Sequence, residues 1–289
     1  MNCAVSDAPE PSPTSSAGYV PYVPEPPVTI GPPLRQLPLG APLTWLRLGW
    51  RDLWQAPAIS GFFGACFALM GLAVLMVFRH APIYTLALCA GFVLLGPLLC
   101  LGLYQVSLRL EQGERPRIED ALGAWMANVK QIAIFAFVLL ILEMLWGRAA
   151  LVIFAVSFDG MPDFAGSVHK LLSADTLGFV TAYLAVGALF AGLIFAISVI
   201  AMPLLLDRDT DAVSAALASL KLCLTQPGVM LLWGVTVAAL TFLAMLPWFA
   251  GLLIVGPWLG HASWHAYRAA LGPREDKLGS SNDKGDIGP

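Results

Sequence analysis

Long apolar segments dominate the sequence, and they allow few folds. They cover residues 59–78, 83–103, 132–158, 177–206, 229–246 and 248–262. About 20 apolar helical residues cross a bilayer core, and the last segment reaches that length only by continuing into the helix beyond it. Charged residues make up 12% of the chain, about half the share in soluble domains. The sequence therefore predicts an all-α, polytopic membrane protein with six transmembrane helices.

The last two segments lie close together and are separated by the stretch "MLPWF" at residues 245–249. We expect a tight helical hairpin there, with a single bent helix as the alternative.

The basic residues predict an orientation for this bundle. With the N-terminus inside, the inner segments hold thirteen of the 16 Lys and Arg residues, and the outer segments hold Arg79, Arg148 and Lys170. Cytoplasmic segments are enriched in Lys and Arg. The bias therefore predicts a multi-pass protein of the bacterial inner membrane with both termini in the cytoplasm.

Both ends of the chain have a composition that differs from the membrane segments. Residues 1–42 contain eleven prolines and few large apolar residues, which favours extended, disordered chain. We therefore expect a disordered cytoplasmic tail at 1–42, a membrane domain at 43–271 and a second disordered cytoplasmic tail at 272–289.

A short sequence occurs twice, as "DALGAWMANVK" at 120–130 and "DAVSAALASLK" at 211–221, with five identities in eleven positions. Both stretches predict amphipathic helices. Apolar residues recur at helical spacing in each, and a third copy precedes the first span. The stripes are Ile118, Leu122, Trp125, Val129 and Ile132; Val213, Leu217, Leu220 and Leu224; and Leu43, Leu46, Trp50 and Leu53.

Each of these amphipathic helices precedes two apolar segments, and the second segment of each pair carries a proline, at Pro97, Pro203 or Pro257. The third copy has Arg51 where the others have Lys130 and Lys221, but it departs from them at Arg47. The order predicts three units, each an interfacial helix followed by two spans. Interfacial helices with basic residues would lie along an anionic leaflet.

Three stretches resemble one family of bacterial integral membrane proteins, the domain-of-unknown-function 2189 family. They are "WLRLGWRDLWQAP", "MPLLLDRDTDAVSAALASLK" and "GHASWHAYRA", and the resemblance covers roughly residues 40–271. It implies a membrane location and no established activity. Some members are labelled as relatives of a cytochrome c oxidase subunit. That label would imply haem ligands in the spans, where the apolar cores hold no histidine.

Glu143 is an acidic residue inside the third apolar segment, near the middle of the bilayer. A carboxylate at that depth faces the bundle, takes a partner or stays protonated. An intramembrane proton or cation site and a neutral structural acid are both consistent with the sequence. Gly256 and Gly260 have the spacing of closely packed helices, and Pro257 between them permits a kink. We expect helix packing here rather than a hinge.

His261 and His265 are four residues apart, on one face of a helix, a spacing that can hold a metal ion. Two imidazoles are too few for a closed site, and Trp264, Tyr267 and Arg268 around them suit an interfacial aromatic belt with a snorkelling cation. We expect the histidines to hydrogen-bond neighbouring loops. The alternating Asp207, Asp209 and Asp211 favour helix capping over a calcium loop.

Nucleotide-binding and hydrolase motifs are missing from the sequence, and the net charge of −3 offers no basic face for nucleic acid. We therefore expect no enzymatic activity, no cofactor and no nucleic-acid partner. The expected partners are the lipid bilayer and other membrane proteins; the oligomeric state is open. A membrane scaffold or assembly component is favoured. A carrier or channel for a small solute or ion is the alternative, and an oxidase-associated membrane protein is a third.

Overall fold

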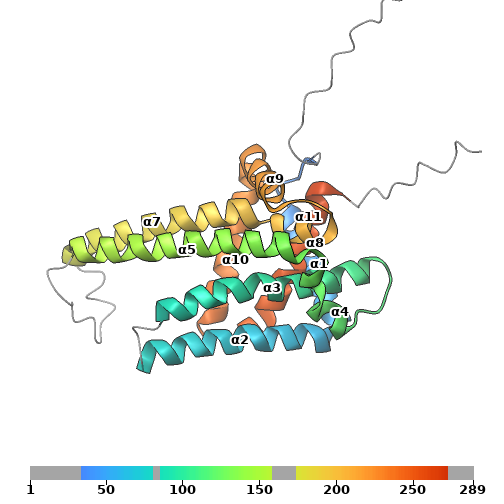
Figure 1. Ribbon diagram of the computed structural model, residues 1–289, viewed down its shortest axis with the longest axis horizontal. Coiled ribbons are helices and arrows are strands. Elements are labelled where there is room, and N and C mark those ends of the chain that lie inside the picture. Colours follow the sequence, from blue (N-terminus) through green and yellow to red (C-terminus); the bar gives the residue numbers. More distant parts are fainter. Residues whose placement is uncertain (1–33, 81–84, 158–173, 273–289) are drawn as a thin grey trace, which may run out of the picture.

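The computed structural model describes residues 34–80, 85–157 and 174–272 (Figure 1). Every regular element in these ranges is a helix, so the predicted all-α class is confirmed. The helices are α1 (Ala41–Gln55), α2 (Pro57–His80), α3 (Thr85–Glu111), α4 (Ile118–Leu122), the 3-10 helix η2 (Ala124–Asn128), α5 (Val129–Ser157), α7 (Ala174–Ser198), α8 (Ala201–Asp207), α9 (Ala212–Thr225), α10 (Pro227–Met245) and α11 (Leu252–Leu271).

Four apolar stretches in the described residues are long enough to cross a membrane. They are Pro57–His80, Ala124–Ser157, Leu177–Asp207 and Pro227–Met245. The predicted integral membrane class agrees with this finding. Helix α11 is more polar, because it carries His261, His265 and Arg268. The number of six spans stays a prediction.

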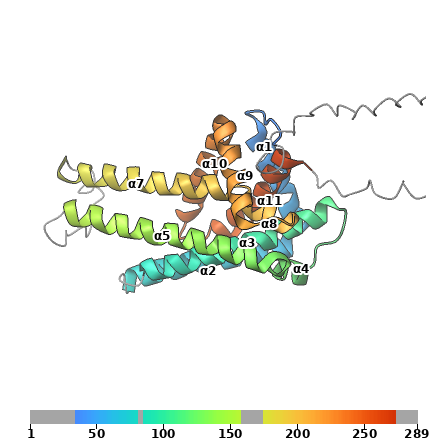
Figure 2. The same cartoon turned by 45° about the horizontal axis from the view of Figure 1, so that its top comes forward.

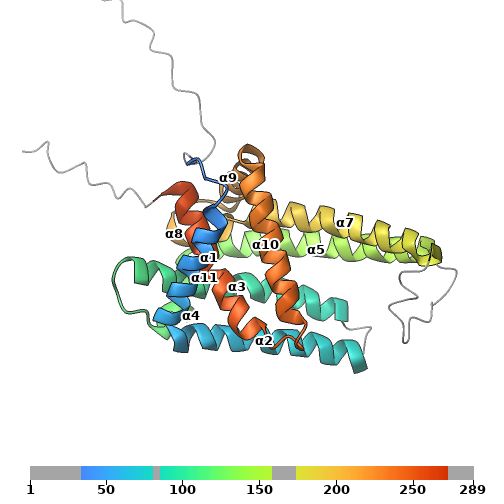
Figure 3. The same cartoon turned by 180° about the vertical axis from the view of Figure 1, so that it is seen from behind.

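The long helices are arranged in two layers (Figures 1 and 3). Helices α2, α3, α5 and α7 lie side by side in that order, and each contacts the next. Helices α1, α10 and α11 run obliquely across one face of this layer. Helix α11 contacts α1, α2, α3 and α10. It is therefore the helix on which the two layers meet. Figure 2 gives a second view of the arrangement, in which α5 and α7 extend beyond the other helices.

The predicted hairpin forms between α10 and α11, and the alternative of one bent helix is wrong. Helix α10 ends at Met245 and α11 begins at Leu252. The chain reverses through Trp248 and Phe249, which have φ angles of 54° and 64°. Non-glycine residues seldom adopt this left-handed conformation. The Arg79 guanidinium carbon lies 4.4 Å from the centroid of the Trp248 ring, so a cation–π contact secures the turn against α2.

The three prolines have different effects on their helices. Pro97 and Pro257 lie inside α3 and α11, which continue as helices. Near Pro203 the fourth apolar segment is instead divided into α7 and α8 at residues 199–200. Proline has no N–H to donate to the carbonyl four residues before it, and its ring crowds that carbonyl. The predicted continuous span at 177–206 is therefore interrupted.

The repeated stretches pack through their alanines. Ala121 and Ala124 are buried, and so are Ala212 and Ala215 at the equivalent positions of the second copy. Several large apolar side chains of the two stripes point outward instead: Leu122 is 49% exposed and Leu224 is 72% exposed, although Ile132 is buried. Small residues let each short helix approach the bundle closely, which leaves these outward side chains free to contact lipid. The first copy is also less regular than predicted, because it divides into α4 and η2 at Gly123.

The predicted N-terminal tail extends too far along the chain. Leu34 and Leu37 pack against the core, and the Arg35 N–H donates to the Ala270 carbonyl at 2.8 Å. Gln226 accepts from the Leu37 N–H and donates to the Arg35 carbonyl. These contacts fix residues 34–42, and α1 begins at Ala41. The expected disorder of residues 1–33 and 273–289 falls outside the described residues.

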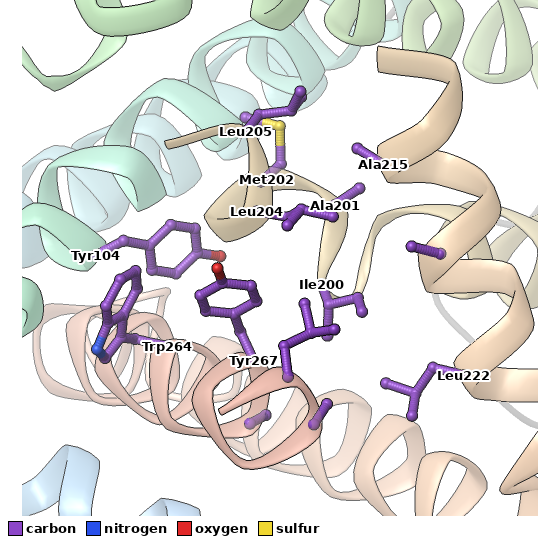
Figure 4. Packing of buried hydrophobic residues seen from close by; sticks show 14 of the residues in the cluster. Tyr104, Ile200, Ala201, Met202, Leu204, Leu205, Ala215, Leu222, Trp264 and Tyr267 are labelled. Carbon is purple, nitrogen blue, oxygen red and sulfur yellow. The ribbon is translucent and has the colours of Figure 1, made fainter. Parts of the chain in front are cut away.

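The main core lies where α3, α8, α9 and α11 meet (Figure 4). Ile200, which immediately precedes α8, fills it together with Leu204 of α8 and Leu222 of α9, and Trp264 and Tyr267 enter from α11. All five side chains are at most 1% exposed. This core fixes the position of α11, whose polar side chains form the candidate site.

Candidate functional site

A set of polar and charged side chains gathers along one end of α11, and we call it the polar cluster. His261 and His265 are four residues apart, as are Trp264 and Arg268, and each pair is offset from the other by three, so all four residues share one side of the helix. Their partners come from α1, α2, α3 and the end of α8. The members are Asp52, Ser60, Ser107, Glu111, Asp207, Arg208, His261, Trp264, His265, Tyr267 and Arg268.

His261 is fully buried between two serines. Its Nε2 lies 3.0 Å from Ser60 Oγ on α2, and its Nδ1 lies 2.8 Å from Ser107 Oγ on α3. A neutral imidazole donates from one nitrogen and accepts at the other. One serine hydroxyl therefore accepts and the other donates, and the ring joins three helices with both nitrogens in use.

His265 contacts α1. Its Nε2 lies 2.7 Å from Asp52 Oδ2, and Asp52 is only 1% exposed. Burial by itself raises the pKa of the Asp52 carboxyl, but the interactions with His265, together with smaller contributions from Ser107 and His261, outweigh burial. The pKa of Asp52 therefore lies below its ordinary value. The carboxylate form is favoured, which gives α1 and α11 a buried polar contact.

Arg268 pairs with carboxylates of two helices. Its Nε donates to Glu111 Oε2 at 2.9 Å, on α3, and its Nη1 donates to Asp207 Oδ2 at 3.3 Å, at the end of α8. The indole N–H of Trp264 donates to the same Glu111 carboxylate at 3.2 Å. The Arg268 side chain is 15% exposed. This cation therefore links α3, α8 and α11 in a largely buried position.

The contacts continue to the end of α11. Tyr267 donates its hydroxyl proton to Asp207 Oδ2 at 2.5 Å, and Arg208 Nε donates to the Tyr267 oxygen at 3.2 Å. Arg208 Nη2 also donates to the carbonyls of Leu271 and Gly272. Trp264 and Tyr267 are fully buried, so the expected interfacial aromatic belt at these residues is wrong. Arg268 likewise pairs within the protein instead of snorkelling.

The two histidines differ from the sequence expectation in their partners. They hydrogen-bond side chains of α1, α2 and α3, whereas neighbouring loops were expected. Within the described ranges, no three His, Cys, Asp or Glu side chains lie where they could share a metal ion. The absence of metal at His261 and His265 stays a prediction.

Gly256 and Gly260 face the neighbouring helices at short range. A Cβ atom on Gly256 would lie 2.7 Å from Phe67 Cδ2 of α2, and one on Gly260 would lie 2.5 Å from Leu103 Cδ1 of α3. A methyl group at either position would therefore force the neighbouring side chain to shift. Pro257 between them is buried in α11.

Glu143 lies at the midpoint of α5 and is half-buried. No hydrogen bond or ion pair links its carboxylate to another residue of the described chain. Arg148 on the same helix is exposed. Neither Glu143 nor Arg148 belongs to the polar cluster.

The members that sequence reasoning missed are Asp52, Ser60, Ser107, Glu111 and Arg208. Each lies in or beside a helix whose pattern was interpreted as amphipathic or spanning. Asp52 is the only acidic residue of α1, and it is buried although α1 looks like an interfacial helix. An acid inside a helix with an apolar stripe was a signal for a buried partner, but it did not show which residue that was.

Of Asp207, Asp209 and Asp211, one caps a helix. Asp211 Oδ2 accepts from the Ser214 N–H at 2.9 Å at the start of α9. Asp207 is buried in the polar cluster instead, and Asp209 is exposed.

Comparison with known proteins gives one family match. Residues 85–207 match the family model described as "Predicted integral membrane protein (DUF2189)". No curated protein and no solved structure matches the chain significantly. The matched segment runs from α3 to the end of α8, so it includes Ser107, Glu111 and Asp207 of the polar cluster.

Proposed function

We propose that this chain, which belongs to the DUF2189 family of predicted integral membrane proteins through residues 85–207, is a non-enzymatic scaffold or assembly component of the bacterial inner membrane. It crosses the membrane six times, has both termini in the cytoplasm, and holds no cofactor.

Two observations support this topology. Thirteen of the 16 basic residues fall on the proposed cytoplasmic side, as the positive-inside rule requires. The start of the described chain also lies beside the end of α11, because the Arg35 N–H donates to the Ala270 carbonyl at 2.8 Å. Termini on one side of a membrane require an even number of spans.

The pairing within the polar cluster supports a scaffold over a carrier. Carriers bind solutes or ions with polar groups that line a pathway through the spans. In this protein Asp52 is bound by His265, and Arg268 joins Glu111 to Asp207. Both nitrogens of His261 are occupied by serines. These groups therefore hold helices together, and a bound solute would have to displace a tertiary contact.

Isolation of the tagged full-length protein from native membranes tests the scaffold proposal. The membranes are crosslinked lightly before extraction in mild detergent, so that a weak partner is retained, and an uncrosslinked sample is processed in parallel. We expect another membrane protein in a fixed ratio to the chain in both samples. Recovery of the chain as a homogeneous species without any partner in both samples would contradict the proposal.

Glu143 is the observation that favours a carrier. It is half-buried at the midpoint of α5 and has no partner among the described residues, and intramembrane acids often mark ion pathways. Proton flux in reconstituted vesicles tests this alternative, with Glu143→Gln as the variant and Asp209→Asn, an exposed acid, as the control. The scaffold proposal predicts no flux above protein-free vesicles. Flux that only Glu143→Gln abolishes would establish the carrier.

A haem-binding role fits the buried histidine of the polar cluster poorly. A haem iron needs an axial side chain with a free lone pair. Both nitrogens of His261 are engaged by serine hydroxyls, so this side chain has none to offer. An oxidase-associated role would therefore depend on contact with a haem protein and not on a haem bound by His261.

A further inference from the structure

Helix α1 has an outward face that the polar cluster does not use. Thr44, Arg47, Trp50 and Arg51 are exposed on it. Together with Leu48 they line a shallow hollow that is open to the surroundings. Arg47 and Arg51 are one helical turn apart, so their guanidinium groups can reach a common ligand on this face.

The charge of this face is positive and poorly compensated. Asp52 is the only acid of α1, and its carboxylate points inward to His265. Arg51 Nη2 lies 3.5 Å from Asp52 Oδ1, but the Arg51 side chain is still 59% exposed. Arg47 has no ion pair with any residue of the described chain. Two cations beside a single shared, buried carboxylate suit an anionic ligand.

The position of α1 indicates where such a ligand would come from. Helix α2, an apolar helix long enough to span the membrane, begins at Pro57, two residues after α1 ends. Trp50 lies between Trp54 and Trp258, with ring centroids 5.8 Å and 5.1 Å away. Tryptophans at the end of a span are typical of the headgroup level of a bilayer. With α1 at this level of the bilayer, the arginines would be within reach of lipid phosphates.

The other two amphipathic stretches lack this pair of cations. Met126 and Leu217 occupy the position of Arg47, and only Lys130 and Lys221 match Arg51. The other two amphipathic stretches therefore carry one basic residue at these two positions, whereas α1 carries two. The additional cation of α1 is Arg47, and it lines the hollow.

We propose that this face of α1 binds the phosphate headgroup of an anionic phospholipid of its own membrane. Arg47 and Arg51 donate to the phosphate oxygens, the Thr44 hydroxyl adds a further donor, and Trp50 packs beside the glycerol and the first part of the acyl chains. This proposal rests on the proposed placement of α1 at the membrane surface.

The test measures how much lipid stays with the purified full-length protein. The protein is exposed to mixed micelles of phosphatidylcholine and phosphatidylglycerol, and retained lipid is counted by native mass spectrometry. The variants are Arg47→Gln and the double variant Arg47→Gln, Arg51→Gln. The control is Arg115→Gln, Arg117→Gln, which removes two exposed arginines from the segment between α3 and α4.

We expect native protein to retain phosphatidylglycerol in preference to phosphatidylcholine. Each arginine removed from α1 should weaken retention of phosphatidylglycerol about fivefold. One Lys or Arg beside an anionic lipid surface raises the affinity for that lipid by about this factor. The control should retain lipid as the native protein does. Because Arg47 has no tertiary ion pair, its single variant remains informative if the double variant does not fold.

Equal retention by native protein and by Arg47→Gln would overturn the proposal. Displacement of the lipid by inorganic phosphate at similar concentration would also overturn it, because the site would then recognise free phosphate. Lipid retention is measured on the isolated chain, so it can fail while the scaffold proposal stands, and the scaffold proposal can fail while lipid is retained.

Discussion

The end of α11 and the α5–α7 pair hold together by different means. At the end of α11, hydrogen bonds and ion pairs join α1, α2, α3 and α8 to one helix. Helices α5 and α7 extend together past the other helices (Figure 1). They meet through aromatic rings, with the Trp146 and Tyr183 centroids 5.0 Å apart, and they leave Val156 84% exposed.

This difference shows how an apolar chain fixes its architecture. Apolar helices gain little from contact with each other instead of with lipid, because acyl chains are as apolar as leucine. A buried charged group that loses its partner is costly, so polar contacts specify which helices meet. The polar cluster therefore defines the arrangement around α11, while the α5–α7 pair relies on ring contacts and on the surrounding lipid.

Arg268→Met should give the largest effect at the α11 end. The substitution keeps much of the side-chain volume but removes the cation that Glu111 and the buried Asp207 share. Removal of one partner from a buried ion pair costs about 3–5 kcal/mol. Because Glu111 is 39% exposed and Asp207 keeps its contacts with Tyr267 and Arg208, we expect the lower end, about 3 kcal/mol. The measurement is the free energy of unfolding in mild detergent, with Arg115→Met at an exposed position as the control. If Arg268→Met loses no more stability than Arg115→Met, the polar contacts of α11 do not stabilise this end of the molecule as described.

Gly64→Ala tests the close approach of α2 to α11. The new Cβ would lie 2.0 Å from the Leu253 carbonyl oxygen, so α11 must move. Overpacking of this kind costs about 1–3 kcal/mol. Gly61→Ala is the matched control one turn earlier, where a Cβ meets nothing within 4 Å, and alanine there should stabilise α2 by about 0.5–1 kcal/mol. If both substitutions change the free energy of unfolding in the same direction, α2 and α11 do not approach each other closely at Gly64.

Trp146→Leu should give the smallest of these losses, because it acts on the α5–α7 pair. The substitution removes the T-shaped ring contact with Tyr183, a kind of contact worth about 0.5–1.5 kcal/mol. It also removes a looser, tilted contact with Phe190, whose centroid lies 6.1 Å away. Met144→Leu, at an exposed neighbour, is the control. If Trp146→Leu destabilises the protein as much as Arg268→Met, the two regions do not differ as described.

The sequence predicted the helical class well, because apolar length and periodicity are local properties. The hairpin at 245–249 followed from the short spacing of the last two segments. The break between α7 and α8 was missed, since Pro97 and Pro257 lie in similar sequence and leave their helices intact. The outcome at each proline depends on the tertiary packing around it. The helical spacing of the large apolar residues predicted the stripe of each repeated helix. It did not predict that the helices pack through alanines, because composition alone does not show which alanines are buried. These are Ala121, Ala124, Ala212 and Ala215.

The candidate site was predicted only from the side of α11. Helical spacing grouped His261 with His265, and the aromatic and basic neighbours were noted. Their partners lie far away in the sequence: Asp52 is 213 residues from His265, and Ser60 is 201 residues from His261. One sequence contains no information on such pairings. For that reason interfacial side chains were expected where the structure has buried ones.

The central claim is that the polar contacts of α11 are structural, and a double-mutant cycle on Asp52 and His265 tests it most directly. The free energy of unfolding is measured for the native protein, Asp52→Asn, His265→Gln and the double variant. Contact residues couple by about 0.5–3 kcal/mol, so the double variant should lose less stability than the two single losses together.

The pH dependence of the same measurement has a defined sign. The pKa of Asp52 is lower in the folded protein than its ordinary value, so its contribution is present above the unfolded pKa, about 4, and is lost as the pH falls through the folded pKa. The gap in stability between native protein and Asp52→Asn should therefore be full at neutral pH and shrink in acid. Additive losses with a gap that does not change with pH would contradict the claim that this contact holds α1 to α11.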